Sequence, residues 1–187
     1  MSYVKILAVR SNGDVVTFGT AKNNHGFAPL VWEKLAKKYK VPRSGSYLMM
    51  DDVALRALWD MFDGDKLSEL DKLLLGATFD RVWVKRETIP KLVEACRAFH
   101  KEYVADNNLV ATVDATADKL EELLEAQPDA LGVAFNMCSA IDSFWDWEDE
   151  ETGAVTNYNV LTNKCHPCTG KRHWEISDCD PEDTPSG

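Results

Sequence analysis

The stretch from residue 79 to residue 103 constrains the fold more than any other part of the sequence. Its first eight residues, 79–86, mix apolar and polar side chains with a period of two around a Val-Trp-Val core. This period places Val82 and Val84 on one face of a strand and Trp83 on the opposite face. The segment therefore predicts a half-buried strand.

A helix is expected to begin directly after this strand. Thr88 can act as N-cap by accepting a first-turn N–H, and Pro90 is tolerated there because the donor it lacks has no partner in the first turn. Apolar residues then recur at spacings of three and four and form one stripe: Ile89, Leu92, Val93, Cys96, Phe99 and Tyr103. The whole stretch predicts a strand that feeds an amphipathic helix packed back on a sheet.

The remaining elements are predicted on either side of this unit. Asn12-Gly13 favours a tight turn between nearly continuous apolar runs at 4–9 and 15–18, which predicts an N-terminal hairpin with both strands buried. Helices are expected at 29–39, from 51 or 52 to 62, at 66–75 with Asp65 as cap, and at 115–126. Extended segments are expected at 109–113 and 131–138, a hairpin at 144–148 and 154–160, and a third strand at 173–176.

These elements give an α+β fold, with an N-terminal β-hairpin, a central strand, several packed helices and an acidic β-rich C-terminal portion. We divide the chain into an α+β core domain at 1–142, a hairpin subdomain with a candidate Cys-His knuckle at 143–179 packed on the core, and a disordered tail at 180–187.

The composition excludes several classes of protein. With 45% hydrophobic residues the chain can build a core, so global disorder is not expected. No run of about 18 apolar residues is present, which argues against a membrane span. The N-terminus lacks the apolar segment of a signal peptide, and the five cysteines are an odd number, so we expect a reducing, cytoplasmic location.

Charge is distributed unevenly along the chain. Residues 1–104 hold 17 Lys and Arg against 13 Asp and Glu, whereas residues 105–187 hold 4 against 18. An acidic surface repels nucleic-acid phosphates and attracts basic protein surfaces, although net charge can also serve solubility alone. No basic patch interleaved with aromatic residues is present, so direct nucleic-acid binding is not expected.

The sharpest concentration of acidic residues follows two tryptophans. We identify one candidate partner-binding stretch, which consists of Trp145, Asp146, Trp147, Glu148, Asp149, Glu150 and Glu151. In an exposed hairpin the carboxylates would present negative charge and the tryptophans would anchor contacts. The alternative is an ordinary core strand whose charged outer face blunts edge pairing.

The best chemical motif lies near the C-terminus. Cys165, Cys168, His173 and Cys179 form the pattern C-x2-C-x4-H-x5-C. Two thiolates three residues apart can hold one Zn²⁺, and four protein ligands would make the site structural. The pattern resembles the retroviral-type zinc knuckle with its last gap one residue longer. An oxidised cysteine pair, or two unconnected thiols, is the alternative.

Other chemistry is sparse. The spacing of Cys96 and His100 suits a metal or a Cys–His nucleophile pair, but it equally describes a core thiol beside a boundary histidine. The polar segment 23–26 could line a small-molecule site or form a plain turn. No phosphate-binding glycine loop, H-E-x-x-H or G-x-S-x-G is present.

The resulting hypothesis is a non-enzymatic acidic protein that docks on and blocks a basic, nucleic-acid-binding surface of a protein partner, in the manner of a phage-type inhibitor or an immunity protein. The alternatives are a small metal-dependent hydrolase that uses clustered carboxylates and a structural zinc module.

Overall fold

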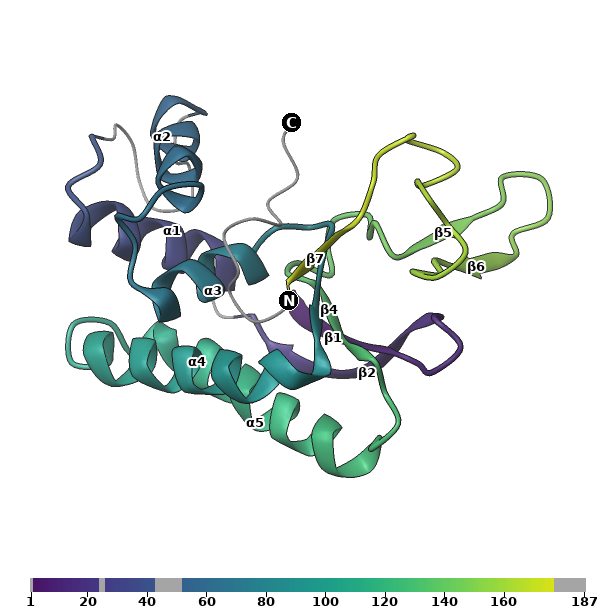
Figure 1. The fold of residues 1–187 in the computed structure, drawn as a ribbon, viewed down its shortest axis with the longest axis horizontal. Helices are drawn as coiled ribbons and strands as arrows, with labels where there is room; N and C mark the ends of the chain where they lie inside the picture. Colours follow the sequence, from purple (N-terminus) through teal and green to yellow (C-terminus); the bar gives the residue numbers. More distant parts are fainter. Residues whose placement is uncertain (1, 24–25, 43–51, 177–187) are drawn as a thin grey trace.

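The computed structural model of the protein describes residues 2–23, 26–42 and 52–176 (Figure 1). The helices are α1 (Phe27–Lys38), α2 (Asp52–Phe62), α3 (Glu69–Ala77), α4 (Ile89–Tyr103) and α5 (Ala111–Ala126), with short 3-10 turns at Arg86–Thr88 and Asn108–Val110. The strands are β1 (Tyr3–Val9), β2 (Val15–Lys22), β3 (Val82–Lys85), β4 (Gly132–Asn136), β5 (Asp146–Glu148), β6 (Val155–Asn157) and β7 (Trp174–Ile176). The α+β class is confirmed.

Five strands form the main sheet, in the order β2-β1-β4-β3-β7. All neighbours are antiparallel except β3 and β7, which run parallel. The predicted N-terminal hairpin is present, and Gly13 has a φ of 90° in its turn. The expectation that both of its strands are buried is wrong for β2, because β2 forms the edge of the sheet and leaves six of its eight residues partly or fully exposed.

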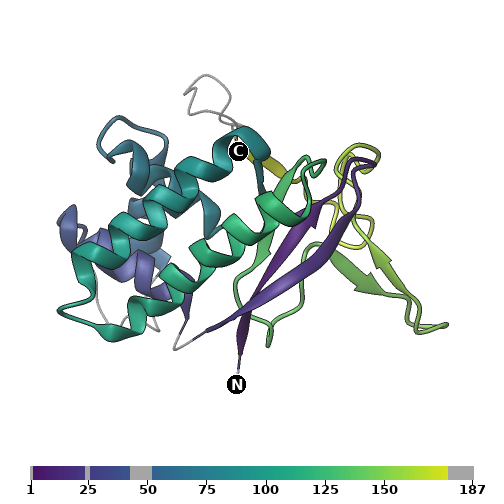
Figure 2. The same ribbon diagram turned by 90° about the horizontal axis from the view of Figure 1, so that it is seen from below.

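The two faces of the sheet carry separate cores. Ile6, Ala8 and Val84 pack against the helices, which lie together on one side of the sheet (Figure 2). Leu7 and Trp83 face the other way and pack against residues of the C-terminal segment, including Tyr158. The alternation along β1 and β3 therefore buries both faces, one under helices and one under the segment that follows β4.

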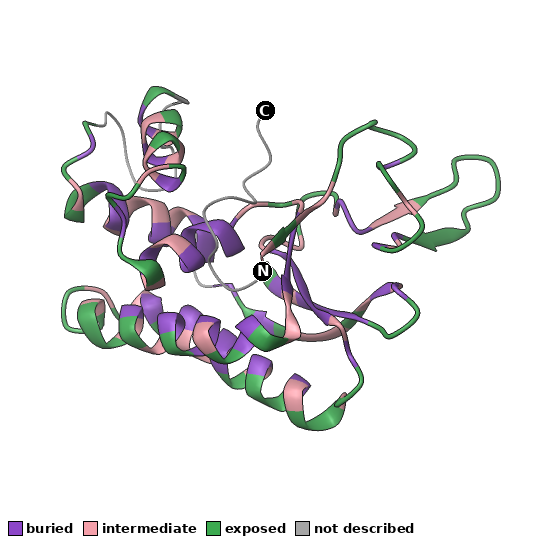
Figure 3. Ribbon diagram, viewed as in Figure 1, coloured by how far each residue is buried: buried purple, intermediate pink, exposed green. Residues whose placement is uncertain are grey.

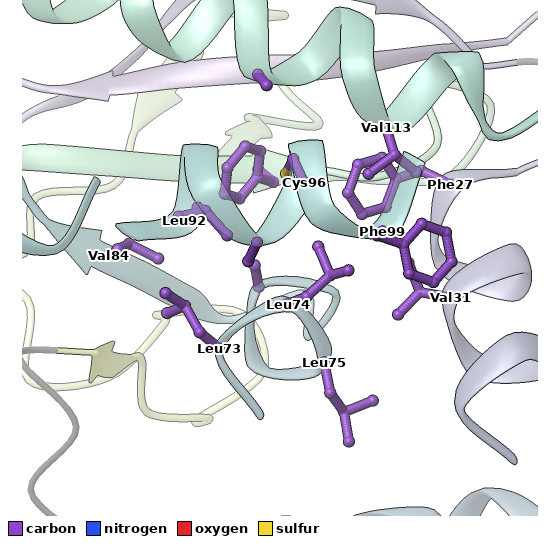
Figure 4. Packing of buried hydrophobic residues seen from close by; sticks show 14 of the residues in the cluster. Phe27, Val31, Leu73, Leu74, Leu75, Val84, Leu92, Cys96, Phe99 and Val113 are labelled. Atoms are coloured by element: carbon purple, nitrogen blue, oxygen red, sulfur yellow. The ribbon is translucent and has the colours of Figure 1, made fainter. Parts of the chain in front are cut away.

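The predicted strand–helix unit is present as β3 followed by α4, but the strand covers Val82–Lys85 rather than 79–86. The expectation of a half-buried strand is wrong, because Trp83 is buried as well as the two valines, with one core on each face of the strand. Leu92, Cys96 and Phe99 on α4 lie against Leu74 of α3 and Val113 of α5 (Figure 4). Thr88 occupies the N-cap position, but its side chain makes no capping hydrogen bond. Its hydroxyl is buried without a hydrogen-bond partner among the described residues, so the predicted cap is wrong although the helix begins where expected.

Several boundaries differ from the sequence prediction. Residues 109–113 are helical rather than extended, because the Asn107 side chain accepts the Leu109 N–H at 2.9 Å and starts a 3-10 turn that runs into α5. Helix α3 is capped by Ser68, not Asp65, with the hydroxyl accepting the Asp71 N–H at 3.2 Å.

The C-terminal segment is tied to the main sheet at two places. The predicted third strand exists as β7, but it pairs with β3 rather than with the β5–β6 hairpin. The Val15 N–H donates to the Tyr158 carbonyl at 2.9 Å, and the Val160 N–H donates to that of Gly13 at 2.9 Å. The predicted tail at 180–187 lies outside the described residues. No helix in the described ranges combines the length and apolarity that a membrane crossing requires.

Candidate functional site

The acidic candidate stretch forms a small hairpin that extends away from the main sheet (Figures 1 and 3). Strands β5 and β6 pair only with each other, and Asp149 begins the loop between them. The Asp149 carboxylate accepts the N–H groups of Thr152 at 2.8 Å and Glu151 at 3.0 Å, and also the Thr152 hydroxyl at 2.9 Å. The Thr152 backbone N–H is the main reason that the pKa of Asp149 is lowered. These hydrogen bonds order the start of the loop, and the lowered pKa favours the ionised form of the Asp149 carboxylate.

The carboxylates of this hairpin have no counter-ions in the described part of the chain. Asp146 is half-buried, and Glu148, Asp149, Glu150 and Glu151 are exposed. None of the five forms an ion pair with a described lysine or arginine. Their negative charge is therefore directed to solvent.

The acidic residues of α5 are in a different situation. Arg97 of α4 contacts three of them, with its guanidinium nitrogens 2.8 Å from Asp114, 2.6 Å from Asp118 and 2.8 Å from Glu121. Lys119 pairs with Glu122 at 2.5 Å on the same helix. Arg97 and Lys119 carry two positive charges against these four carboxylates, so the α4–α5 contact offsets part of the acidic charge there. The hairpin differs because none of its five carboxylates has a described lysine or arginine as counter-ion.

The two tryptophans of the candidate stretch have different environments. Trp145 is 1% exposed, and its indole N–H donates to the Phe135 carbonyl at 3.1 Å. Its ring lies 5.6 Å from that of Tyr158 in an edge-to-face arrangement. The assignment of Trp145 as a partner contact is therefore corrected, because its surface is already buried in the core. Trp147 is half-buried, with its ring 4.9 Å from His166.

The C-terminal motif presents two exposed free thiols, Cys165 and Cys168. His173 is held by Tyr158, whose hydroxyl lies 2.8 Å from the His173 Nδ1 and donates to the Asn163 carbonyl at 2.9 Å. With the hydroxyl proton directed toward Asn163, the hydroxyl oxygen is positioned to accept a proton from Nδ1, and in that tautomer Nε2 has a free lone pair. Burial lowers the pKa of His173, which favours the neutral ring that a metal requires.

The ligands of the predicted zinc site are not assembled in the described ranges. No group of three or more His, Cys, Asp or Glu residues there is placed to hold a metal ion. Cys179, the fourth predicted ligand, lies outside the described residues. The zinc site thus stays a prediction.

The Cys96–His100 pair is placed as a core thiol beside a boundary histidine. Cys96 is 1% exposed, and burial raises the pKa of its thiol to about 12. A thiol with this pKa remains protonated near neutral pH and is a poor nucleophile. His100 is directed instead toward Asp114, with 3.8 Å between its Nδ1 and the carboxylate.

A cavity of about 610 Å³ lies between α1, α2 and the residues that follow β4. Its walls include aromatic residues from distant parts of the chain: Trp32, Trp59, Phe79, Phe135 and Phe144. Asn23 and Gly26 of the polar segment 23–26 also line it, while residues 24 and 25 lie outside the described ranges. Sequence reasoning missed the aromatic lining, since a cavity wall and a packed core show the same apolar periodicity.

Comparison with known proteins gives no relative from which a function could be transferred: no protein-family model matches the chain, and no curated protein and no solved structure is significantly similar to it.

Proposed function

We propose that the protein is a non-enzymatic binding protein whose β5–β6 hairpin docks on a basic surface of a protein partner and blocks it. The observation that carries this proposal is the group of five hairpin carboxylates, at positions 146 and 148–151, without counter-ions among the described residues. A basic surface that normally contacts nucleic acid has the complementary charge. An inhibitor of the phage type or an immunity protein would act in this way.

The shape of the hairpin supports the same proposal. Its loop is closed by backbone hydrogen bonds between Asp149 and Ala154 at 2.9 Å and between Gly153 and Asp149 at 2.8 Å. A loop that is ordered before binding loses less conformational entropy when it docks. Half-buried Trp147 at its base offers an apolar contact beside the charges, as binding hot spots often do.

The test compares two triple variants with equal changes in charge. One carries Glu148→Gln, Glu150→Gln and Glu151→Gln, which leaves the structural Asp149 intact. The control neutralises three exposed acids on the helix side of the molecule, at Glu94, Asp106 and Glu125. The unmodified protein and the two variants are each immobilised and exposed to a cell lysate at 50, 150 and 500 mM salt. The lysate proteins that each retains are quantified by mass spectrometry.

The proposal predicts a retained basic protein whose affinity falls about threefold to a hundredfold with the hairpin variant, because three exposed ion pairs at roughly 0.2–1 kcal/mol each contribute about 0.6–3 kcal/mol together. Its recovery should also fall at 500 mM salt, which screens these pairs. Recovery on the control variant should match that of the unmodified protein, and added nucleic acid should compete for the retained partner. Equal recovery on both variants, or retention that ignores salt, would rule out the hairpin as the docking surface.

We also propose that the C-terminal motif binds structural zinc through Cys165, Cys168, His173 and Cys179. The observation that favours it is the hydrogen bond between His173 Nδ1 and the Tyr158 hydroxyl at 2.8 Å, which fixes the ring through Nδ1 and leaves Nε2 as the nitrogen that could bind a metal. Metal analysis of the purified protein should find one zinc per chain, lost in Cys165→Ser and kept in Cys96→Ser. Zinc that survives Cys165→Ser would contradict the ligand assignment.

A further inference from the structure

We propose that the cavity between α1, α2 and the end of β4 binds a small hydrophobic organic cation, with an aromatic or aliphatic body and a protonated amine. The inference is independent of the hairpin, since none of the five hairpin carboxylates lines the cavity.

The size and walls of the cavity select the body of the ligand. About 610 Å³ lies within the range of about 300–1,000 Å³ typical of small-molecule sites. Trp59 and Phe79 meet edge to face in the wall, with ring centroids 5.2 Å apart. Aromatic and aliphatic side chains make up most of the lining, so the enclosed part of a ligand has to be apolar.

The polar groups in the wall are already engaged within the protein. The Asn23 amide donates to the Met137 carbonyl at 2.9 Å and accepts the Phe27 N–H at 2.7 Å. The Thr78 hydroxyl accepts the Trp32 indole N–H at 2.9 Å and donates to a backbone carbonyl at 2.6 Å. These bonds fix the side chains of the wall and use most of their donors and acceptors. A strongly polar ligand would lose its hydrogen bonds to water on entering the cavity and would gain few from the wall.

The charge at the cavity selects the head group. The charged residues among its described lining are Asp80 and Asp142, both exposed, and no lysine or arginine is among them. Arg81 forms a long ion pair with Asp80 at 3.9 Å, and its guanidinium is stacked over the Phe79 ring at 5.0 Å, so Asp142 is the lining carboxylate that has no ion pair with a described lysine or arginine. An anionic head would be repelled by Asp142, whereas an ammonium group gains from Asp142, from Asp80 beside its arginine, and from the aromatic faces of the wall.

Three probes with the same ring and different heads test this inference: 2-(1-naphthyl)ethylamine, 2-(1-naphthyl)ethanol and 1-naphthaleneacetate. Binding is followed by the NMR shift of the Trp32 and Trp59 indole N–H groups, which lie in the wall. The amine should bind saturably and roughly threefold to tenfold tighter than the alcohol, and the carboxylate should bind most weakly.

Variants then locate the source of this preference. Asp80→Asn with Asp142→Asn should make the amine and the alcohol bind equally, because the head group loses its counter-charges. Asp106→Asn with Glu125→Gln, exposed acids of α5 and of the turn that precedes it, should leave the preference unchanged. The triple hairpin variant should also leave it unchanged, which separates this inference from the proposed docking function.

A free thiol provides a second readout. Cys138 lines the cavity, while Cys165 does not. With chelator present, saturating amine should slow alkylation of Cys138 by N-ethylmaleimide severalfold and leave Cys165 unaffected. The inference is overturned if the amine gives no saturable shift, or if the amine and the alcohol bind equally to the unmodified protein. It is also overturned if the preference for the amine persists in the Asp80→Asn, Asp142→Asn variant, or if the triple hairpin variant abolishes it.

Discussion

Replacement of Trp145 by alanine tests whether this residue belongs to the core. The indole is 1% exposed, and an indole side chain buries about 150–250 Å². At about 25 cal/mol per Å² this area corresponds to about 4–6 kcal/mol, of which alanine retains a small part. Loss of the hydrogen bond to the Phe135 carbonyl adds about 1 kcal/mol. Trp-to-Ala changes in cores cost about 3–5 kcal/mol, so we expect a loss of about 4 kcal/mol.

The assay is urea unfolding followed by circular dichroism. With an m-value of about 2 kcal/mol per M, the midpoint of Trp145→Ala should fall by about 2 M. The melting temperature should fall by about 8–16 °C, since about 1 kcal/mol shifts a chain of this size by about 2–4 °C. A thermal scan of the same samples checks this value.

Trp147→Ala is the matched control, because the residue is half-buried on the hairpin and its loss should cost less than about 1.5 kcal/mol. Equal destabilisation by the two variants would refute the assignment of Trp145 to the core. So would a Trp145→Ala protein of normal stability that has lost partner binding, since that is the behaviour of an interface residue.

Two further predictions concern single buried positions. Gly132→Ala should lower the free energy of unfolding in urea by about 1–3 kcal/mol or more, because an added Cβ would lie 2.2 Å from the Val84 carbonyl oxygen. Gly19→Ala is the control: the nearest atom to its Cβ would be 3.5 Å away, so stability should change by less than about 0.5 kcal/mol. Equal destabilisation by the two variants would contradict the close approach of β3 to Gly132 of β4. The pKa of the Cys96 thiol is about 12 in the folded protein against about 9.0 when free, so the unfolded chain loses this proton first as the pH rises. The free energy of unfolding of the unmodified protein should therefore fall relative to that of Cys96→Ala by about 1.4 kcal/mol from pH 7 to pH 10. A difference between the two proteins that does not change with pH would argue against full burial of the thiol.

Local periodicity was sufficient to predict a strand followed by a helix between 79 and 103, but not the bounds of the strand or the burial of both its faces. Val82 and Val84 face the helices while Trp83 faces the C-terminal segment, as the period of two requires. The same information was insufficient at 109–113, where apolar residues with β-branched side chains resemble a strand. Val110 and Val113 are both buried at a helical spacing, and the Asn107 side chain starts the turn. A capping residue two positions upstream thus outweighed the strand propensity of the run.

Long-range pairings account for the features that the sequence did not predict. β7 is three residues long and pairs with β3, with Trp174 opposite Val82, so no local signal could indicate its partner. The different environments of Trp145 and Trp147 depend on Tyr158 and Phe135, which reach Trp145 only after folding. The cavity has the same origin, because its walls come from separate helices and from the residues after β4.

The spatial distribution of charge explains why the hairpin, rather than the whole acidic half, is the proposed docking surface. Arg97 contacts three carboxylates of α5, and Lys85 of β3 lies 3.3 Å from Glu175, so basic residues of the first half offset part of the acidic charge of the second half. The hairpin carboxylates have no such partner among the described residues. The hairpin residues 148–151 are consecutive, and neighbouring residues in extended chain are separated by about 3.3 Å. Adjacent charges therefore lie well within one Debye length, about 8 Å at physiological salt, and the ends of the run lie at most about 10 Å apart, so the four carboxylates act on a partner together. At 500 mM salt the Debye length is shorter than the run of hairpin charges. Partner binding through these carboxylates should therefore be lost when salt is added.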